Sequence, residues 1–527
     1  MTSNFATAMT SCAKTCNGAV SLSSPDISGN TSGRLGLFFK SVRGLNAPRL
    51  YEYLRESAQE NIIDAFLLAF HIRDCRGGKG ERELGRRSLV WLFLNYPEQL
   101  NLVAPLISEY GRWDDLMELW PGVLDLKDAN YLEQNYYSNI KDISRLRDLQ
   151  ITFVKILGNQ LVNDRLQMHD GKPISICAKW APTEKDSYDK KYGVVNTLTK
   201  VMGITAKSYR KAYTTPLRQY LHIVETYMCD KKWDEIDYSK VPSCAMKRLK
   251  KTFEKNAPEE FLAWKTKLQN GEVKVNGKQL YPHELIQEIR TKHRSDTVCE
   301  AQWKVLEDEV NKLGSLQDSL FVCDVSTSML SWSSDQKLSF CPMDVAVGLS
   351  LLGANNVKGV FHNHIITFHD NPSFHVVKDG TLYDRWLKLT SSPWGGSTNL
   401  QATFDLILNQ AKVHKLSQQD MPKRLFIISD MQFDSADRSY MTNFQVIKTK
   451  YTESGYKQPE IVFWNVCGST TDFPVSVSDN GTALISGFSA SIMSALINGT
   501  DFSPYSTLRS TLDSQRLEPV RRALKKE

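Results

Sequence analysis

The hydrophobic pattern changes character near Asp318, and this change constrains the fold of the 527-residue chain more than any other feature. Beyond that point, continuous apolar runs of strand length alternate with segments of helical periodicity. The apolar runs are residues 319–323, 365–368, 425–428 and 461–464, and the helical patterns cover 343–352, 399–413 and 440–451. Strands that are apolar on both faces need cover on both sides, and alternating helices supply it around a mainly parallel sheet. We therefore expect a Rossmann-like α/β domain over residues 316–500.

The preceding half of the chain has a different period. From residue 34 to residue 300 the apolar residues recur at helical spacing, and the breaks between segments are short. Ile62, Phe66, Ala69 and Phe70, for example, share one helical face. Short-looped helices that bury one face each predict an α-helical, HEAT-like repeat array, although no literal sequence repeat is present. Residues 1–33 are rich in small polar residues and predict a disordered tail, and residues 501–527 predict a basic C-terminal tail.

Composition excludes two classes of protein. No stretch approaches the roughly 18 apolar residues that span a bilayer, and the start lacks the basic and apolar regions of a secretion signal. The ten cysteines are scattered without a CxxC pair, which is typical of reduced thiols. The expected location is the cytoplasm, the nucleus or a virus particle, with neither membrane insertion nor secretion.

The positive charge is concentrated in one region. Residues 171–260 hold 18 Lys and Arg against 11 Asp and Glu, and residues 190–224 contain no acidic residue. Cations interleaved with aromatic rings are typical of single-stranded nucleic-acid binding, because cations neutralise phosphates and rings stack on bases. The alternative is a solvated helical face whose tyrosines belong partly to the core. The candidate RNA-binding residues are Lys190, Lys191, Lys200, Lys207, Tyr209, Arg210, Lys211 and Arg218.

Oxygen-bearing side chains follow three segments of the α/β pattern. Asp324, Ser326 and Ser328 form a DxSxS motif after the first strand, Thr398 precedes a helix, and Asp430 closes the strand 425–429. The carboxyl ends of parallel strands meet at one edge, where α/β sheets bind ligands. Carboxylate and hydroxyl oxygens suit Mg²⁺, with Mn²⁺ or Ca²⁺ as alternatives. The other interpretation of the motif alone is a helix cap.

This set resembles the metal-ion-dependent adhesion site of von Willebrand factor A (vWA) domains, whose pattern is DxSxS, then T, then D. The resemblance implies that the hydroxyls of Ser326, Ser328 and Thr398 coordinate the cation directly. It implies that Asp324 and Asp430 act largely through bound water, with one position open for an acidic group from a partner.

The helical half has its own resemblance. Residues 73–82 (RDCRGGKGER) and 110–116 (YGRWDDL) are similar to motifs of TROVE modules, the helical-repeat rings joined to a vWA domain in the Ro autoantigen. Residues 179–183 and 241–243 are more similar to a sister family from plants, fungi and large DNA viruses with the same domain order. The resemblance covers about residues 35–500.

The sequence disfavours nucleotide binding at residues 77–80 and catalysis. The segment Gly77-Gly78-Lys79-Gly80 lacks the phosphate-loop spacing and follows a helical pattern, so it is expected to be a helix junction in which Arg73 and Arg76 pair with Asp74 or Glu81. No hydrolase or kinase motif appears, so no enzyme activity is expected.

The sequence thus leads to two hypotheses. The first is an RNA-binding, ribonucleoprotein-type protein with a metal-binding vWA domain and no DNA sequence specificity. The second is a metal-dependent protein-binding scaffold in an assembly, a viral particle included, whose partner supplies an acidic residue to the metal.

Overall fold

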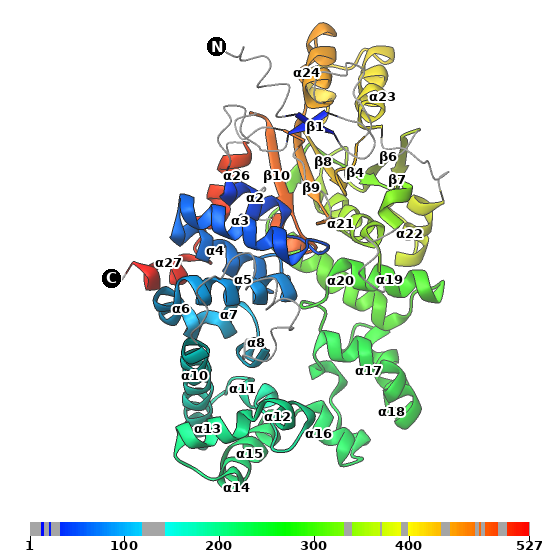
Figure 1. The fold of residues 1–527 in the computed structure, drawn as a ribbon. Coiled ribbons are helices and arrows are strands. Elements are labelled where there is room, and N and C mark those ends of the chain that lie inside the picture. The colour runs from blue at the N-terminus through cyan, green and yellow to red at the C-terminus, as the bar shows by residue number, and fades with distance from the viewer. Residues whose placement is uncertain are drawn as a thin grey trace, which may run out of the picture.

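The fold combines a six-stranded sheet with a long series of helices that extends away from the sheet and returns to it (Figure 1). The computed structural model describes residues 12–14, 20–22, 32–118, 143–330, 340–368, 371–391, 399–433, 443–468, 474–475, 480–493 and 503–525. Of the expected N-terminal tail, only two short strands are described, β1 (Cys12–Lys14) and β2 (Val20–Leu22), which pair antiparallel. Within the described ranges, no helix combines the length and the apolar character that crossing a membrane requires.

The α/β region follows the helical region, as the change of periodicity predicts. Its sheet has the order β10-β9-β8-β4-β6-β7, and only the edge strand β7 is antiparallel. The strands are β4 (Ser319–Asp324), β6 (His364–Phe368), β7 (Ser373–Val376), β8 (Arg424–Ser429), β9 (Glu460–Asn465) and β10 (Thr482–Ser486). The four predicted strands are confirmed as β4, β6, β8 and β9, whereas β7 and β10 were not predicted. A two-residue ladder of β3 (Leu316–Gln317) and β5 (Val357–Lys358) lies outside this sheet.

The strand order reverses at β4. The chain proceeds from β4 to β6 and β7 on one side, and then crosses to β8, β9 and β10 on the other. Four helices accompany these strands, α21 (Pro342–Asn356), α22 (Leu382–Thr390), α23 (Leu400–Val413) and α24 (Asn443–Glu453). In an open α/β sheet such a reversal leaves a crevice beyond the carboxyl ends of the two strands involved. The fold therefore marks the carboxyl ends of β4 and β8 as a ligand position.

The helical region leaves the sheet and returns to it. In Figure 1 the helix α2 lies beside β10, α3–α8 continue below it, α10 runs away from the sheet, α11–α15 form the far end, and α17–α20 lead back. The first group is α2 (Gly33–Lys40), α3 (Ala47–Glu60), α4 (Ile62–Arg73), α5 (Arg82–Asn95), α6 (Pro97–Val103), α7 (Ile107–Tyr110) and α8 (Trp113–Glu118). The second is α10 (Ile143–His169), α11 (Cys177–Trp180), α12 (Ser187–Tyr192), α13 (Val194–Met202), α14 (Ala206–Tyr209) and α15 (Thr215–Tyr220). The third is α16 (Val224–Cys229), α17 (Ser243–Asn256), α18 (Pro258–Gln269), α19 (Pro282–Lys292) and α20 (Thr297–Lys312).

The buried apolar residues form three clusters that do not follow the predicted domain boundary. One cluster joins the first helical group to the sheet and includes Leu37, Phe66, Phe321 and Trp464. The second lies among α10–α15 with Met117 of α8, and the third among α16–α18 with Val298 of α20. The first helices therefore share a core with the α/β region, because both bury their apolar faces against each other.

Lys79 anchors the first helical group to the edge of the sheet. Its ammonium donates to the carbonyl of Phe38, to the carbonyl of Ser41 at 3.0 Å and to the hydroxyl of Ser486 in β10 at 2.7 Å. These three acceptors use all three of its protons. The segment around Lys79 is thus a junction, as expected, and its lysine is buried away from any phosphate. The expected pairing of Arg73 and Arg76 with Asp74 or Glu81 is wrong, because Arg73 instead binds Asp115 at 2.6 Å.

The end of the chain differs from the expected tail. Residues 504–524 form the helices α26 (Pro504–Leu512) and α27 (Glu518–Leu524), which pack on the first helical group. Two basic residues hold them there, since Arg509 pairs with the buried Asp64 at 2.6 Å and Arg516 with the buried Asp74 at 2.9 Å. The basic residues of this segment thus serve the fold, because buried carboxylates need a cationic partner.

Candidate metal centre and basic surface

Four of the five predicted metal-site residues meet at the reversal point of the sheet. Asp324 ends β4, Ser326 and Ser328 lie in the turn that follows, and Asp430 follows β8. The Ser326 and Ser328 hydroxyl oxygens are 3.0 Å apart, and Ser328 hydrogen-bonds Asp430. Thr398 lies outside the described residues.

The two carboxylates of this centre are buried. Asp324 is fully buried and Asp430 is 5% exposed. Burial, and next the neighbouring charge of Asp430, raise the pKa of Asp324 to about 7. Burial also raises the pKa of Asp430, against the hydrogen bonds from the Gln432 amide and from Ser328. Two carboxylates that are removed from water and close to each other repel, and a cation between them would offset that repulsion.

The donor set fits a hard divalent cation. It consists of two carboxylates and two hydroxyl oxygens, the ligand types that Mg²⁺ accepts while retaining bound water. Across the described part of the chain, no three His, Cys, Asp or Glu side chains gather as a group that could hold a metal ion. A cation at the end of β4 would therefore rely on the serine hydroxyls beside the two carboxylates. When bound, it would supply a Lewis-acidic position for an acidic ligand.

One neighbour outside the predicted set, Ser429, belongs to the centre. The Ser429 hydroxyl donates to Asp324 Oδ2 at 2.5 Å, and the Ser326 amide donates to Asp324 Oδ1 at 2.9 Å. Met431, directly after Asp430, has a left-handed backbone with φ 65°, which is uncommon for a residue with a side chain. In the sequence, Ser429 stands directly before Asp430 at the end of a predicted strand. Its contact with Asp324, however, depends on the pairing of β8 with β4, which the sequence pattern does not give.

The predicted basic surface lies on the far helices, and five of its cations are exposed. Lys190 is on α12, Lys200 on α13 and Lys207 on α14, and Arg210 and Lys211 follow directly. None of the five side chains has an ion pair or hydrogen bond to another group in the described ranges. Such cations remain available to an anionic partner.

The helix that carries three of these cations contains a π-helical turn. Residues Arg210–Thr214 form this turn between α14 and α15. Pro216, two residues beyond it, lacks the N–H that an α-helix would direct to the carbonyl of Ala212. Lys207 precedes Arg210 and Lys211 by three and four positions, which places the three on one side of the helix. Single π-helical turns recur at functional sites.

Two of the predicted RNA-binding residues belong to the fold. Tyr209 is 1% exposed and its hydroxyl donates to the Pro182 carbonyl at 2.8 Å, so its ring cannot stack on a base. Arg218 donates to the carbonyls of Ala178 and Ala181 at 2.9 and 2.7 Å, which joins α15 to α11. The alternative interpretation, a helical face with tyrosines in the core, is correct for Tyr209. The side chain of Lys191 lies outside the described residues.

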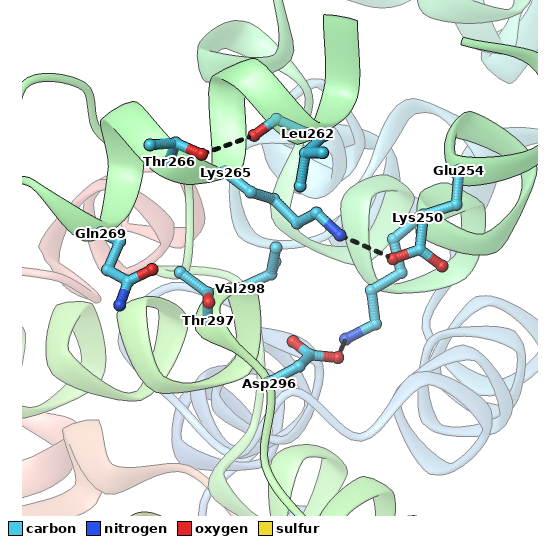
Figure 2. A pocket seen from close by; sticks show the side chains of 9 residues that line it. All are labelled: Lys250, Glu254, Leu262, Lys265, Thr266, Gln269, Asp296, Thr297 and Val298. Carbon is cyan, nitrogen blue, oxygen red and sulfur yellow. Dashed lines mark hydrogen bonds and ion pairs between the residues drawn. The ribbon is translucent and has the colours of Figure 1, made fainter. Parts of the chain in front are cut away.

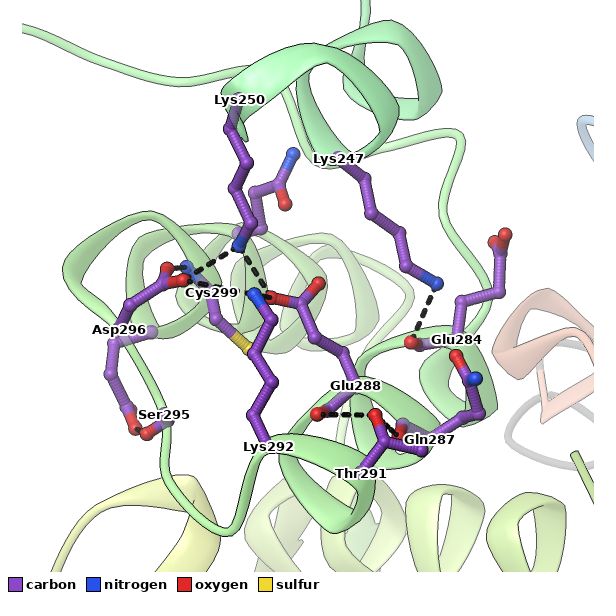
Figure 3. Close-up of polar contacts among 12 residues, drawn as sticks. Lys247, Lys250, Glu284, Gln287, Glu288, Thr291, Lys292, Ser295, Asp296 and Cys299 are labelled. Carbon is purple, nitrogen blue, oxygen red and sulfur yellow. Dashed lines mark hydrogen bonds and ion pairs between the residues drawn. The ribbon is translucent and has the colours of Figure 1, made fainter. Parts of the chain in front are cut away.

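A pocket between α17, α18 and the start of α20 is lined by charged residues (Figure 2). Lys265 pairs with Glu254 at 3.0 Å, and Lys250 pairs with Asp296 at 2.8 Å. Figure 3 shows Lys250 reaching Glu288 as well, a carboxylate that Lys292 also binds at 2.7 Å. Because these charges neutralise one another, we interpret the cluster as the connection between α17, α19 and α20.

Asp296 allows this ion-pair cluster to be tested by pH. Burial alone would raise the pKa of Asp296, but the charge and hydrogen bond of Lys250 outweigh it and hold the pKa below the ordinary value. Asp296→Asn keeps the N-cap of α20, because an amide oxygen can also accept from the Cys299 amide. We expect a loss of roughly 1 kcal/mol at pH 7, since the carboxylate is 39% exposed and partly screened.

A carboxyl group with a lowered pKa stabilises the folded state above its unfolded pKa of about 3.9 and loses that contribution as pH falls through its folded value. The stability difference between wild type and Asp296→Asn should therefore begin to shrink below about pH 4 in thermal melts and vanish only below the lowered pKa of the folded state. A difference that persists unchanged at pH 3 would contradict the ion-pair role.

Comparisons with known proteins divide the chain near residue 317, directly before β4. A domain of unknown function, DUF2828, matches residues 126–316, and another, DUF7788, matches residues 318–525. "Uncharacterized protein L728" from Acanthamoeba polyphaga mimivirus is 31% identical over 517 residues, which cover 93% of this chain and 86% of the viral protein. The second match includes α26 and α27, so the C-terminal helices belong with the α/β region.

Proposed function

We propose that this chain, which belongs to the same family as the mimivirus protein L728, is an RNA-binding protein with a divalent-cation site in a vWA-like α/β domain. The observation that carries the RNA assignment is the group of exposed, unpaired cations Lys190, Lys200, Lys207, Arg210 and Lys211 in a stretch without acidic residues. The expected ligand is single-stranded or structured RNA, bound mainly through its phosphates and without DNA sequence specificity.

Charge reversal of the exposed group tests this proposal. In Lys207→Glu, Arg210→Glu, Lys211→Glu, three phosphate contacts are lost and repulsion is added, while Tyr209 and Arg218 remain in place. RNA affinity should fall, and the slope of log K against log salt should become shallower by roughly 2, since each phosphate contact on a single strand contributes about 0.7. Fluorescence anisotropy with labelled RNA at several salt concentrations measures both quantities.

A matched control changes the net charge equally at another place. Lys388, Lys412 and Lys415 are exposed residues of the α/β region, and their replacement by Glu should leave the salt slope unchanged. Equal weakening in both triple variants would show a general charge effect and would reject the assignment to α14 and its π-helical turn.

The second candidate function is a metal-dependent protein-binding scaffold, in an assembly such as a virus particle. The convergence of Asp324, Ser326, Ser328 and Asp430 favours it, because this centre is remote in the fold from the basic helices.

The variant Asp324→Ala separates the two candidate functions. It should bind RNA as wild type does if the helices carry that activity, and it should lose an EDTA-sensitive protein partner if the α/β domain is the binding module. The proposed location is the cytoplasm, the nucleus or a virion.

A further inference from the structure

Ser429 holds one oxygen of the Asp324 carboxylate from a neighbouring strand. It is the last residue of β8 and is fully buried, and its Oγ lies 2.5 Å from Asp324 Oδ2. No motif in the sequence includes this serine. It directly precedes Asp430, the second carboxylate of the candidate metal centre.

The hydroxyl of Ser429 has two hydrogen-bond partners. It accepts from the Met431 amide at 3.0 Å and donates its own proton to Asp324. The left-handed conformation of Met431 accompanies this contact. Such a conformation is strained for a residue with a side chain and persists only where the surrounding structure enforces it.

Asp324 is therefore held at both oxygens by donors from the turn after β4 and from the end of β8. The Ser326 amide binds Oδ1 and the Ser429 hydroxyl binds Oδ2, which prevents the carboxylate from rotating about its terminal bond. The two hydrogen bonds fix the orientation of the carboxylate, so its remaining lone pairs point in fixed directions. Those directions decide how well it could support a cation beside Ser326 and Ser328.

We propose that Ser429 is the positioning residue of the cation site, acting through Asp324 without contacting the metal. The inference rests on the proposed cation site and adds the residue that determines its affinity. Outer hydrogen-bond partners of metal ligands orient those ligands, and their loss typically weakens metal binding by 10–100-fold.

Titration calorimetry of the full chain with MgCl₂ and with MnCl₂ tests the proposal. Ser429→Ala should weaken binding of both cations by about 10–100-fold. Ser429→Thr keeps the hydroxyl and should retain most of the affinity. Ser429→Cys fills the same space with a weak donor and should behave like the alanine variant, so it gives the answer if Ser429→Ala does not fold.

Ser319→Ala is the matched control. Ser319 is a fully buried serine at the opposite end of β4, and its hydroxyl donates to the Gln317 carbonyl at 2.8 Å. It should lower the melting temperature about as much as Ser429→Ala does and leave cation affinity unchanged. A general loss of stability would weaken binding in both variants alike, and that result would overturn the positioning role.

The remaining outcomes separate the two proposals. If wild type binds the cations and folded Ser429→Ala and Ser429→Cys bind them equally well, the role of Ser429 is wrong while the cation site stands. If wild type itself binds neither Mg²⁺ nor Mn²⁺, the cation site is wrong, and the inference about Ser429 fails with it.

Discussion

Asp324→Ala should abolish the binding of Mg²⁺ and Mn²⁺ while the chain stays folded. The variant removes one of two buried carboxylates, and the Asp430 carboxylate with two hydroxyl oxygens leaves too few anionic ligands for a hard divalent cation. Removing the carboxylate also ends its repulsion with Asp430, which offsets the hydrogen bonds lost from Ser326 and Ser429. The expected result is a loss of affinity beyond 100-fold in calorimetry, with a small change in melting temperature.

Asp318→Asn provides the matched control for this measurement. Asp318 lies directly before β4, at the end opposite to Asp324, and its carboxylate is partly exposed and pairs with Lys423 at 2.6 Å. Its left-handed backbone, with φ 46°, suits asparagine. The control should bind cations as wild type does. Wild-type affinity in a folded Asp324→Ala protein would reject the cation site.

Asp115→Ala should have the largest effect on stability. The Asp115 carboxylate is fully buried and binds Arg73 at 2.6 Å and Arg86 at 2.6 Å, and it accepts from the Arg112 amide at 2.7 Å. Arg73 is itself 3% exposed, so the variant leaves a buried guanidinium without its counter-ion. Removing one partner of such a pair typically costs about 3–5 kcal/mol. Hydrogen exchange should show the loss in α4, α5 and α8, the helices that these residues join.

Asp114→Ala is the comparison for Asp115. Asp114 is the preceding residue, and its side chain, 14% exposed, pairs with Arg112, 36% exposed, and with Arg86. Solvent screens the pair with Arg112, and Arg86 keeps Asp115 as a partner in the variant, so the expected cost is about 1 kcal/mol. If the two variants lose equal amounts of unfolding free energy, or if Asp115→Ala loses less than about 1 kcal/mol, burial does not determine how much these ion pairs stabilise the fold.

The candidate metal centre could be predicted largely from sequence because its information is local. Asp324, Ser326 and Ser328 are neighbours in one turn, and the apolar strand before them places that turn at a sheet edge. Asp430 could be added because its strand is also apolar and parallel strands end at the same edge. Ser429 was missed, because its contact with Asp324 depends on the pairing of β8 with β4, which no local pattern encodes.

The basic surface was predicted less well, since charge identifies a region but not the direction of each side chain. Lys207, Arg210 and Lys211 are exposed as expected. Tyr209, between them in sequence, turns into the core. These helices are short and one contains a π-helical turn, so a regular period of 3.6 residues does not assign their faces.

The sequence by itself determined the order of a helical half and an α/β half, four of the six strands of the main sheet, and the oxygen-bearing turn after β4. These features depend on periodicity and spacing within a few residues. Only the tertiary structure decided that the first helices share a core with the sheet and that the C-terminal basic residues are structural. Arg509 meets Asp64, and Arg516 meets Asp74, across more than 440 positions of the chain. Such pairings follow from how folded elements bury their charges against one another, and a linear pattern of residues does not contain that information.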